Sequence, residues 1–180
     1  MNKIVQRIKN AGWLKDVGYE VQFRENPFGN IWRVRVSAPV DGQLVDAQLD
    51  IFGNGRLHLR NAYHTSTIIF SKKHAKLIAE ALATLLITRY FELAIERLSV
   101  ENSAKSRLLK FSDNYTYCEF SARVTQQFRL EASAKIEKQT KNLEISLSLR
   151  QDWKEKKEIT KGSFSVVLPV FKALLLQLAL

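Results

Sequence analysis

The sequence predicts an α+β fold made of two repeats, each a β-meander followed by a helix, with the helices packed on one face of antiparallel sheets. Apolar and polar residues alternate with a period of two over two long regions, 19–60 and 107–150. Each region is followed by apolar residues that recur at intervals of three and four. At an offset of 98 residues, Ile68–Phe70 aligns with Val166–Leu168, which indicates an internal repeat.

The composition supports a folded chain. Of the 180 residues, 46% are hydrophobic, which is enough to form a substantial core. We expect an N-terminal amphipathic helix at 1–17, a first repeat at 18–100 and a second at 101–180, together forming one compact domain.

The N-terminal residues 2–16 place Ile4, Val5 and Ile8 on one helical face, with basic residues between them. This pattern favours a helix that covers the core or a subunit contact. A basic targeting peptide or a membrane-surface helix is the alternative.

The first meander alternates over four expected strands separated by turn signals. These strands are 19–24, 32–37, 45–51 and 56–60. A short fifth strand, Thr67–Phe70, is expected to lead into a helix that begins near Ser71, a good N-cap residue, and continues to Leu98.

The second meander repeats this order. Its expected strands are 107–111, 117–124, 128–137 and 143–150. For the charged segment at 152–162 the sequence predicts neither a helix nor a strand. A short strand, Phe164–Leu168, is then expected before a helix with Pro169 in its first turn.

The chain is strongly basic, with a formal net charge of +10 and a pI of about 9.8. Each half carries 14 Lys and Arg against 9 Asp and Glu, which argues against a separate basic arm. A polyanion is therefore the first partner to consider, although an unremarkable basic protein would show the same total.

Catalytic signatures are missing from the sequence. The three histidines and the single cysteine have no metal-ligand spacing, and Cys118 lies on the apolar parity of its strand. We therefore expect a non-enzymatic protein without metal or cofactor. One cysteine permits no intrachain disulfide, which favours a reducing intracellular compartment, and no apolar run predicts integral membrane association.

Cations recur at the alternate strand positions that carry polar residues, and tyrosines nearby could stack with nucleic-acid bases. Arginine suits phosphate because its planar guanidinium donates two hydrogen bonds. The same pattern fits an ordinary solvated sheet face, since carboxylates are interspersed. The candidate nucleic-acid-binding residues are Arg24, Arg33, Arg35, Arg56, Arg60, Tyr115, Tyr117, Arg123, Arg129 and Lys135.

Two segments carry a resemblance to a known family. Gly55–Arg60, followed by Ser66–Phe70 and a helix, is similar to the strand–helix portion of a PUR repeat, and Phe164–Leu175 is similar to the end of such a unit. The chain thus resembles the Whirly/PUR superfamily of single-stranded nucleic-acid-binding proteins. The Lys-Gly-Lys-Ala-Ala-Leu stretch of plant Whirly proteins is absent from the sequence. The resemblance implies binding of single-stranded DNA or RNA on the sheet and oligomerisation through helices.

The resulting hypothesis is largely sequence-tolerant binding of single-stranded DNA or RNA by a homo-oligomer. The alternative is a structural or adaptor protein that acts through helix-mediated homo-oligomerisation or protein partners. The apolar C-terminal helix favours this alternative.

Overall fold

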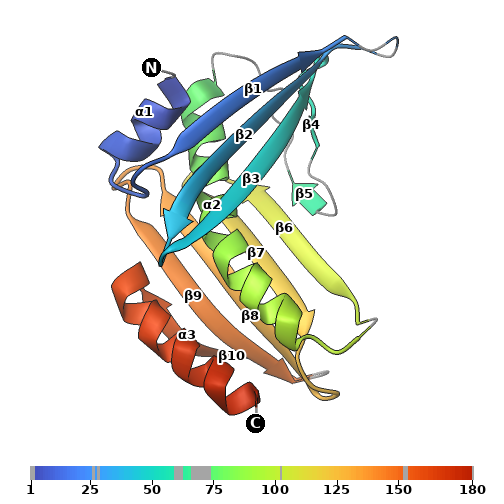
Figure 1. The fold of residues 1–180 in the computed structure, drawn as a ribbon, viewed down its shortest axis with the longest axis vertical. Coiled ribbons are helices and arrows are strands. Elements are labelled where there is room, and N and C mark those ends of the chain that lie inside the picture. Colours follow the sequence, from blue (N-terminus) through green and yellow to red (C-terminus); the bar gives the residue numbers. More distant parts are fainter. Residues whose placement is uncertain are drawn as a thin grey trace.

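The computed structural model describes residues 3–25, 27, 29–58, 63–65, 74–101, 103–151 and 154–179. These residues form helices and two largely antiparallel sheets, which confirms the predicted α+β class (Figure 1). The helices are α1 (Lys3–Asn10), α2 (Ala75–Leu98) and α3 (Phe164–Leu178).

The first sheet is a meander in which neighbouring strands are also consecutive in the chain. Its strands are β1 (Gly18–Arg24), β2 (Ile31–Val40), β3 (Gln43–Phe52) and β4 (Leu57–His58). Asp41 and Gly42 both have positive φ, 49° and 74°, and form the two-residue turn between β2 and β3. Such turns match the twist of the strands that they join.

The second sheet has the order β10-β9-β8-β7-β6-β5. Its strands are β5 (Tyr63–Thr65), β6 (Lys105–Phe111), β7 (Tyr115–Arg123), β8 (Phe128–Glu137), β9 (Leu143–Gln151) and β10 (Lys156–Gly162). All its pairs are antiparallel except β5–β6. Because β5 precedes α2 in the chain, the first half contributes a strand to the second sheet.

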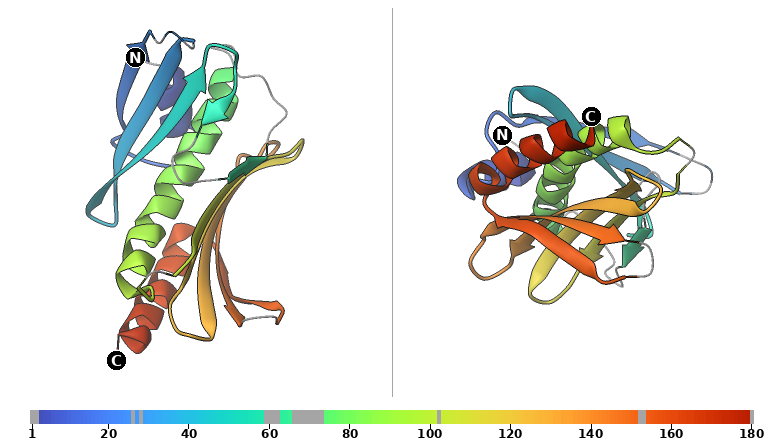
Figure 2. Two further views of the ribbon diagram at one scale, coloured as in Figure 1. Left: turned by 90° about the vertical axis from the view of Figure 1, so that its right-hand side faces the viewer. Right: turned by 90° about the horizontal axis from the view of Figure 1, so that it is seen from below.

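Helix α2 lies between the two sheets and is buried around most of its circumference (Figure 2). Its residues Leu82 and Phe91 are fully buried. α1 packs against α2, and α3 packs on β9 and β10. The rings of Phe91 and Phe171 meet edge to face with centroids 4.8 Å apart, which joins α2 to α3.

The predicted strand Phe164–Leu168 is wrong, because these residues form the first turns of α3. The helix follows Ser163, whose backbone is extended, and it buries Val167 in the core. Burial of a helical apolar face here outweighs the β preference of valine. Pro169 consequently lies inside the helix, so the two helices do not start together at an offset of 98 residues.

The charged segment without an expected element contains β10. Most β10 side chains are exposed because β10 is the edge strand of the sheet, so the sequence there shows no apolar alternation. Three predicted features lie outside the described residues: the strand Thr67–Phe70, the helix cap at Ser71 and the last two residues, 59–60, of the fourth strand.

Candidate nucleic-acid interface

The second sheet presents one face to α2 and the other away from it (Figure 2). Alternation along the strands assigns each side chain to a face. Cys118, Phe120 and Leu130 lie on the inner face and are buried. Most polar side chains of β7, β8 and β9 lie on the opposite face, here called the outer face, whereas Thr116 lies on the inner face and donates a hydrogen bond to Glu80 of α2.

Four cations stand directly across from one another on this outer face. The register pairs Arg123 with Arg129, Arg129 with Arg150, and Arg150 with Lys156. These four residues, the cation row, cross four adjacent strands. Three inter-strand spacings of about 4.8 Å give the row a length of about 15 Å.

Like charges directly opposite one another destabilise a sheet, so the row needs compensation. Arg129 Nε donates to Ser121 Oγ at 3.1 Å, and its Nη2 donates to the Ala104 carbonyl at 3.1 Å. Arg123 donates to the Gln126 carbonyl at 3.1 Å. The partners of Arg129 are neutral, so these bonds leave the charge of its guanidinium group uncompensated.

The other half of the row is held by a buried carboxylate. Glu131 lies 3.2 Å from Arg150 and 2.6 Å from Lys156, and Glu119 lies 3.1 Å from Lys156. Burial lowers the pKa of Lys156, but its bonds to Glu131 and Glu119 outweigh burial and raise the pKa above its ordinary value. Lys156 therefore remains charged at neutral pH.

Tyr117 and Lys135 lie opposite each other, further along the outer face from the row. Burial and a hydrogen bond from its hydroxyl to Glu119 raise the pKa of Tyr117, which keeps the phenol protonated. Lys135 lies 3.3 Å from Glu144. A shallow pocket of about 380 Å³ opens here, lined by Tyr117, Ser133, Lys135, Glu144, Ser146, Ser148, Lys156, Glu158 and Lys161.

Tyr115 begins β7 and is half-buried. The Lys110 ammonium lies 5.8 Å from the centroid of its ring. This distance is within the range of a cation–π contact. An aromatic ring and a cation thus stand together at the end of the outer face opposite the cation row.

The predicted arginines of the first sheet are placed differently. Arg33 donates two hydrogen bonds of 2.9 Å to Asp50, and the bond to Asp50 is the largest cause of its raised pKa. Arg35 lies 3.2 Å from Asp46. Arg24 and Arg56 are exposed, and Arg60 lies outside the described residues.

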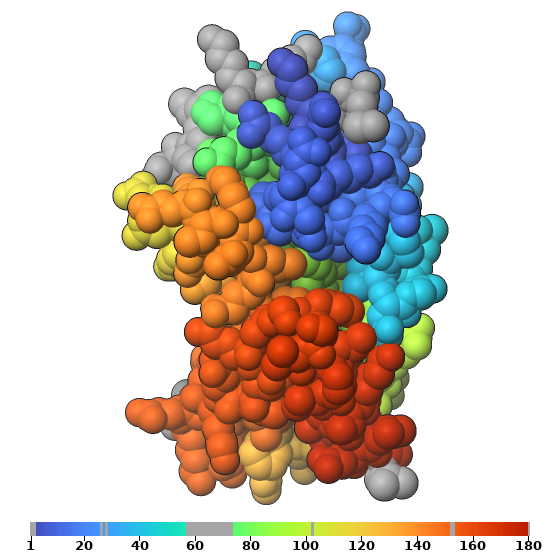
Figure 3. Space-filling view, turned by 90° about the vertical axis from the view of Figure 1, so that its left-hand side faces the viewer, coloured from blue at the N-terminus to red at the C-terminus, as the bar shows by residue number. Residues whose placement is uncertain are grey.

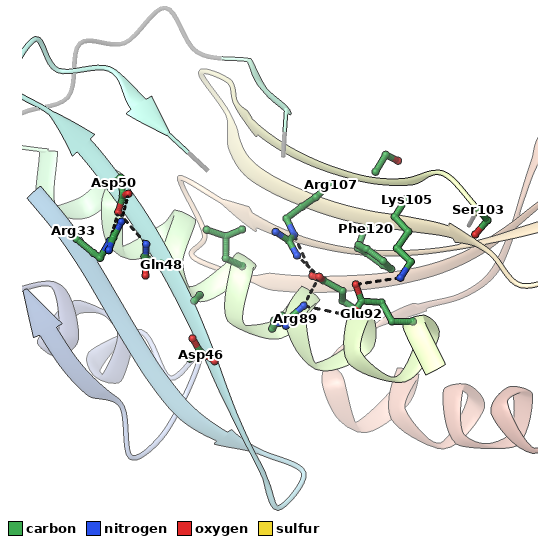
Figure 4. A pocket seen from close by; sticks show the side chains of 14 residues that line it. Arg33, Asp46, Gln48, Asp50, Arg89, Glu92, Ser103, Lys105, Arg107 and Phe120 are labelled. Carbon is green, nitrogen blue, oxygen red and sulfur yellow. Dashed lines mark hydrogen bonds and ion pairs between the residues drawn. The ribbon is translucent and has the colours of Figure 1, made fainter. Parts of the chain in front are cut away.

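A cleft of about 1020 Å³ separates the two sheets, with α2 at its floor (Figure 4). Arg33 reaches it from β2, whereas Arg107 reaches it from the inner face of β6. Arg107 and Arg89 both contact the buried Glu92. The cleft is electrically balanced, since its lining includes the cations Arg33, Arg89, Lys105 and Arg107 and the carboxylates Asp46, Asp50, Glu92 and Glu96.

Two members of the cation row, Arg150 and Lys156, were not among the sequence candidates. Arg150 ends a predicted strand with the parity of the outer face, which was an available signal. Lys156 lies in the segment to which no strand was assigned. Its place becomes visible only through the pairing of β10 with β9.

Cys118 lies on the inner face, where burial raises the pKa of its thiol to about 12. The thiol therefore stays protonated at neutral pH and belongs to the core. Within the described residues, no group of three or more His, Cys, Asp or Glu side chains is arranged to hold a metal ion.

Comparisons with protein families, curated proteins and solved structures gave no match for this chain. Among the described residues, the helices are too short or too polar to cross a membrane.

Proposed function

We propose that the protein binds single-stranded DNA or RNA, without catalysis and largely independently of sequence, on the outer face of the second sheet. The observation that carries this proposal is the cation row, in which four cations stand directly opposite one another across four adjacent strands. Phosphate oxygens of an extended strand are the natural partners of such a row.

The path of the strand follows from the geometry of β8. Arg129 and Lys135 are six positions apart on this strand, about 20 Å. A single strand that meets the row with its phosphates can reach Tyr117 and Tyr115 with its bases, which stack on aromatic rings regardless of their identity. The resemblance to the Whirly/PUR superfamily supports the same mode of binding.

The carboxylates beside the cation row limit the expected affinity for a single strand. Glu131 and Glu119 already neutralise part of the charge of Arg150 and Lys156, so a phosphate must compete with them. With at most four phosphates neutralised, the logarithm of the association constant should fall with log salt at a slope of about −3 or shallower.

Fluorescence anisotropy with a labelled 30-mer, as single strand and as duplex, tests the proposal across a salt series. Single-strand binding that is tighter than duplex binding and weakens with salt is expected. Absence of binding at low salt, or a preference for duplex, would overturn the proposal.

A matched pair of variants locates the site. The side chains of Arg150 and Arg35 are 49% and 51% exposed, and each lies 3.2 Å from a carboxylate. Arg150→Gln should weaken single-strand binding about fivefold to tenfold, because it removes a phosphate contact, whereas Arg35→Gln should leave binding within twofold. Equal losses from both variants would mean that net charge, and not the row, governs binding.

A second candidate is a structural or adaptor role through homo-oligomerisation. It is favoured by α3, which has Lys172 as its one charged residue and leaves several large apolar side chains exposed. Sedimentation equilibrium of the intact chain tests it, since a monomer at all concentrations would exclude this role.

A further inference from the structure

Helix α3 forms an exposed ridge on one face of the molecule, beside the turn between β2 and β3 (Figure 3). Only Val167 and Phe171 of its 15 residues are buried. Val166 is 53% exposed, Val170 36% and Leu176 72%. A helix of this composition in water has a large apolar surface without a partner.

The exposed apolar residues share one side of the helix. They recur at intervals of three and four positions, and all are exposed: Val166, Pro169, Val170, Ala173 and Leu176. This apolar stripe faces away from Val167 and Phe171, which point into the core. Its length, about 15 Å from first to last residue at 1.5 Å per residue, covers most of the helix.

The charge around the stripe narrows the choice of partner. Lys172 flanks the stripe and lies 2.7 Å from Asp41, so this cation is neutralised within the molecule. A helix that lies on an anionic membrane carries Lys and Arg on its polar face, and α3 has no other cation. An uncharged patch on a chain of net charge +10 instead lets two copies meet without opposed cations at the contact.

We propose that a second copy of this chain docks on the apolar stripe, with the two α3 helices packed antiparallel about a two-fold axis near Ala173. A two-fold contact uses the same surface on both copies, and the small Ala173 side chain allows the helix axes to approach within about 8–10 Å. Two such helices bury roughly 1,000 Å² in total, the lower limit for a specific interface, so the dimer should be reversible.

This arrangement leaves the candidate nucleic-acid interface free. α3 packs on the face of the second sheet that also meets α2, whereas the cation row lies on the opposite face. Each dimer would therefore carry two outward-facing rows. The inference develops the second candidate function and does not depend on nucleic-acid binding.

The first test is the mass of the intact protein by sedimentation equilibrium between about 1 and 100 μM. The unmodified chain should approach the dimer mass with rising concentration, and Val170→Glu should remain monomeric. Val21→Glu is the matched control, because Val21 is 39% exposed on β1 and adds the same charge outside α3. A monomeric unmodified chain, or equal effects of both variants, would overturn the proposal.

The second test does not depend on a destabilising variant. Ala173→Cys places a thiol beside its own copy at the two-fold axis, so mild oxidation should give a disulfide-linked dimer. Gln139→Cys, exposed in the turn after β8, should not cross-link, and the native Cys118 is buried. Equal cross-linking of both variants, or none for Ala173→Cys, would contradict the two-fold arrangement.

Two further measurements separate the outcomes. In a flotation assay with vesicles of anionic lipid, the unmodified chain should stay in the unbound fraction. If instead the unmodified chain floats with the vesicles and Val170→Glu does not, the apolar stripe binds a membrane and the dimer proposal is wrong. A 12-mer single strand should bind Val170→Glu and the unmodified chain equally, because the substitution lies in α3, on the face of the sheet away from the cation row. Failure of nucleic-acid binding would thus leave the mass measurements unaffected, and the reverse also holds.

Discussion

The outer faces of the two sheets carry the same kinds of residue in opposite arrangements. On the first sheet, Arg33 stands opposite Asp50 and Arg35 stands opposite Glu20 and Gln48. On the second sheet, Arg123, Arg129 and Arg150 stand opposite one another. The availability of a cation for a ligand thus depends on the carboxylates on the neighbouring strands. Asp50 lies directly opposite Arg33 and holds it with two hydrogen bonds. Carboxylates two positions further along, Asp46 beside Arg35 and Glu131 beside Arg150, leave those cations about half exposed.

The inner face of the second sheet carries a third kind of cation, because Arg107 there forms an ion pair with the buried Glu92 and stabilises the fold. Glu92→Gln should lower the free energy of unfolding by about 3 kcal/mol, since it leaves Arg107 and Arg89 without their buried partner. Urea denaturation measures this loss. Glu96→Gln, whose ion pairs are 3.8 Å long and partly exposed, should cost less than about 1 kcal/mol. Similar losses from both variants would show that the burial of Glu92 has no special weight.

The carboxylate beside the cation row should restrain binding. Glu131→Gln removes the charge that competes with phosphate for Arg150 and Lys156, so single-strand affinity at low salt should rise about threefold to tenfold. The counterpart on the first sheet, Asp50→Asn, releases Arg33 but should change affinity less than twofold. Anisotropy titrations compare the two, and a larger gain from Asp50→Asn would move the site to the first sheet.

The salt dependence should identify individual phosphate contacts. Arg123→Gln should make the slope of log affinity against log salt shallower by about 0.7, the contribution of one phosphate contact on a single strand. Arg24→Gln, an exposed arginine at the end of β1, serves as the control and should leave the slope unchanged. An unchanged slope in Arg123→Gln would remove this residue from the row's binding function.

The smallest expected effect concerns the contact between the β2–β3 turn and α3. The pKa of Asp41 lies below its ordinary value of 3.8. The largest cause is the hydrogen bond from Lys172, and the second is the hydrogen bond from Tyr90. A carboxyl with a lowered pKa in the folded state stabilises that state above its ordinary pKa, and the gain disappears as the pH falls through the lowered value.

Asp41→Asn should therefore lower the melting temperature by up to about 2 °C at pH 6, and this difference should vanish towards pH 2. Thermal melts of both proteins across this range measure it. A difference that persists unchanged at the acid end would mean that the charge of Asp41 is not its cause.

Most of the strands could be predicted because each has one buried and one solvated face. The expected strand 128–137 coincides with β8, and 143–150 differs from β9 by one residue. Two features near the C-terminus, the strand β10 and the first turns of α3, could not be predicted in this way. The alternation that predicts a strand is missing from the edge strand β10, and the valines of α3 favour a strand until Val167 finds a place against the core.

The candidate site was predicted only in part. Arg123, Arg129 and Lys135 were placed on a common face correctly, since parity alone assigns the face of a strand. Arg107 lies on the inner face of the same sheet, because its register pairs it with Phe120 and its charge is matched by the buried Glu92.

By itself, the sequence determined the α+β class, the two meanders with their helices and the net charge of +10, because periodicity and composition are local properties. Only the tertiary structure decided that α2 lies between the sheets, that Arg33 is held by Asp50 and that Arg150 and Lys156 join the cation row. The neighbour across a ladder depends on the register of two strands, and register follows from turns and from packing against the core.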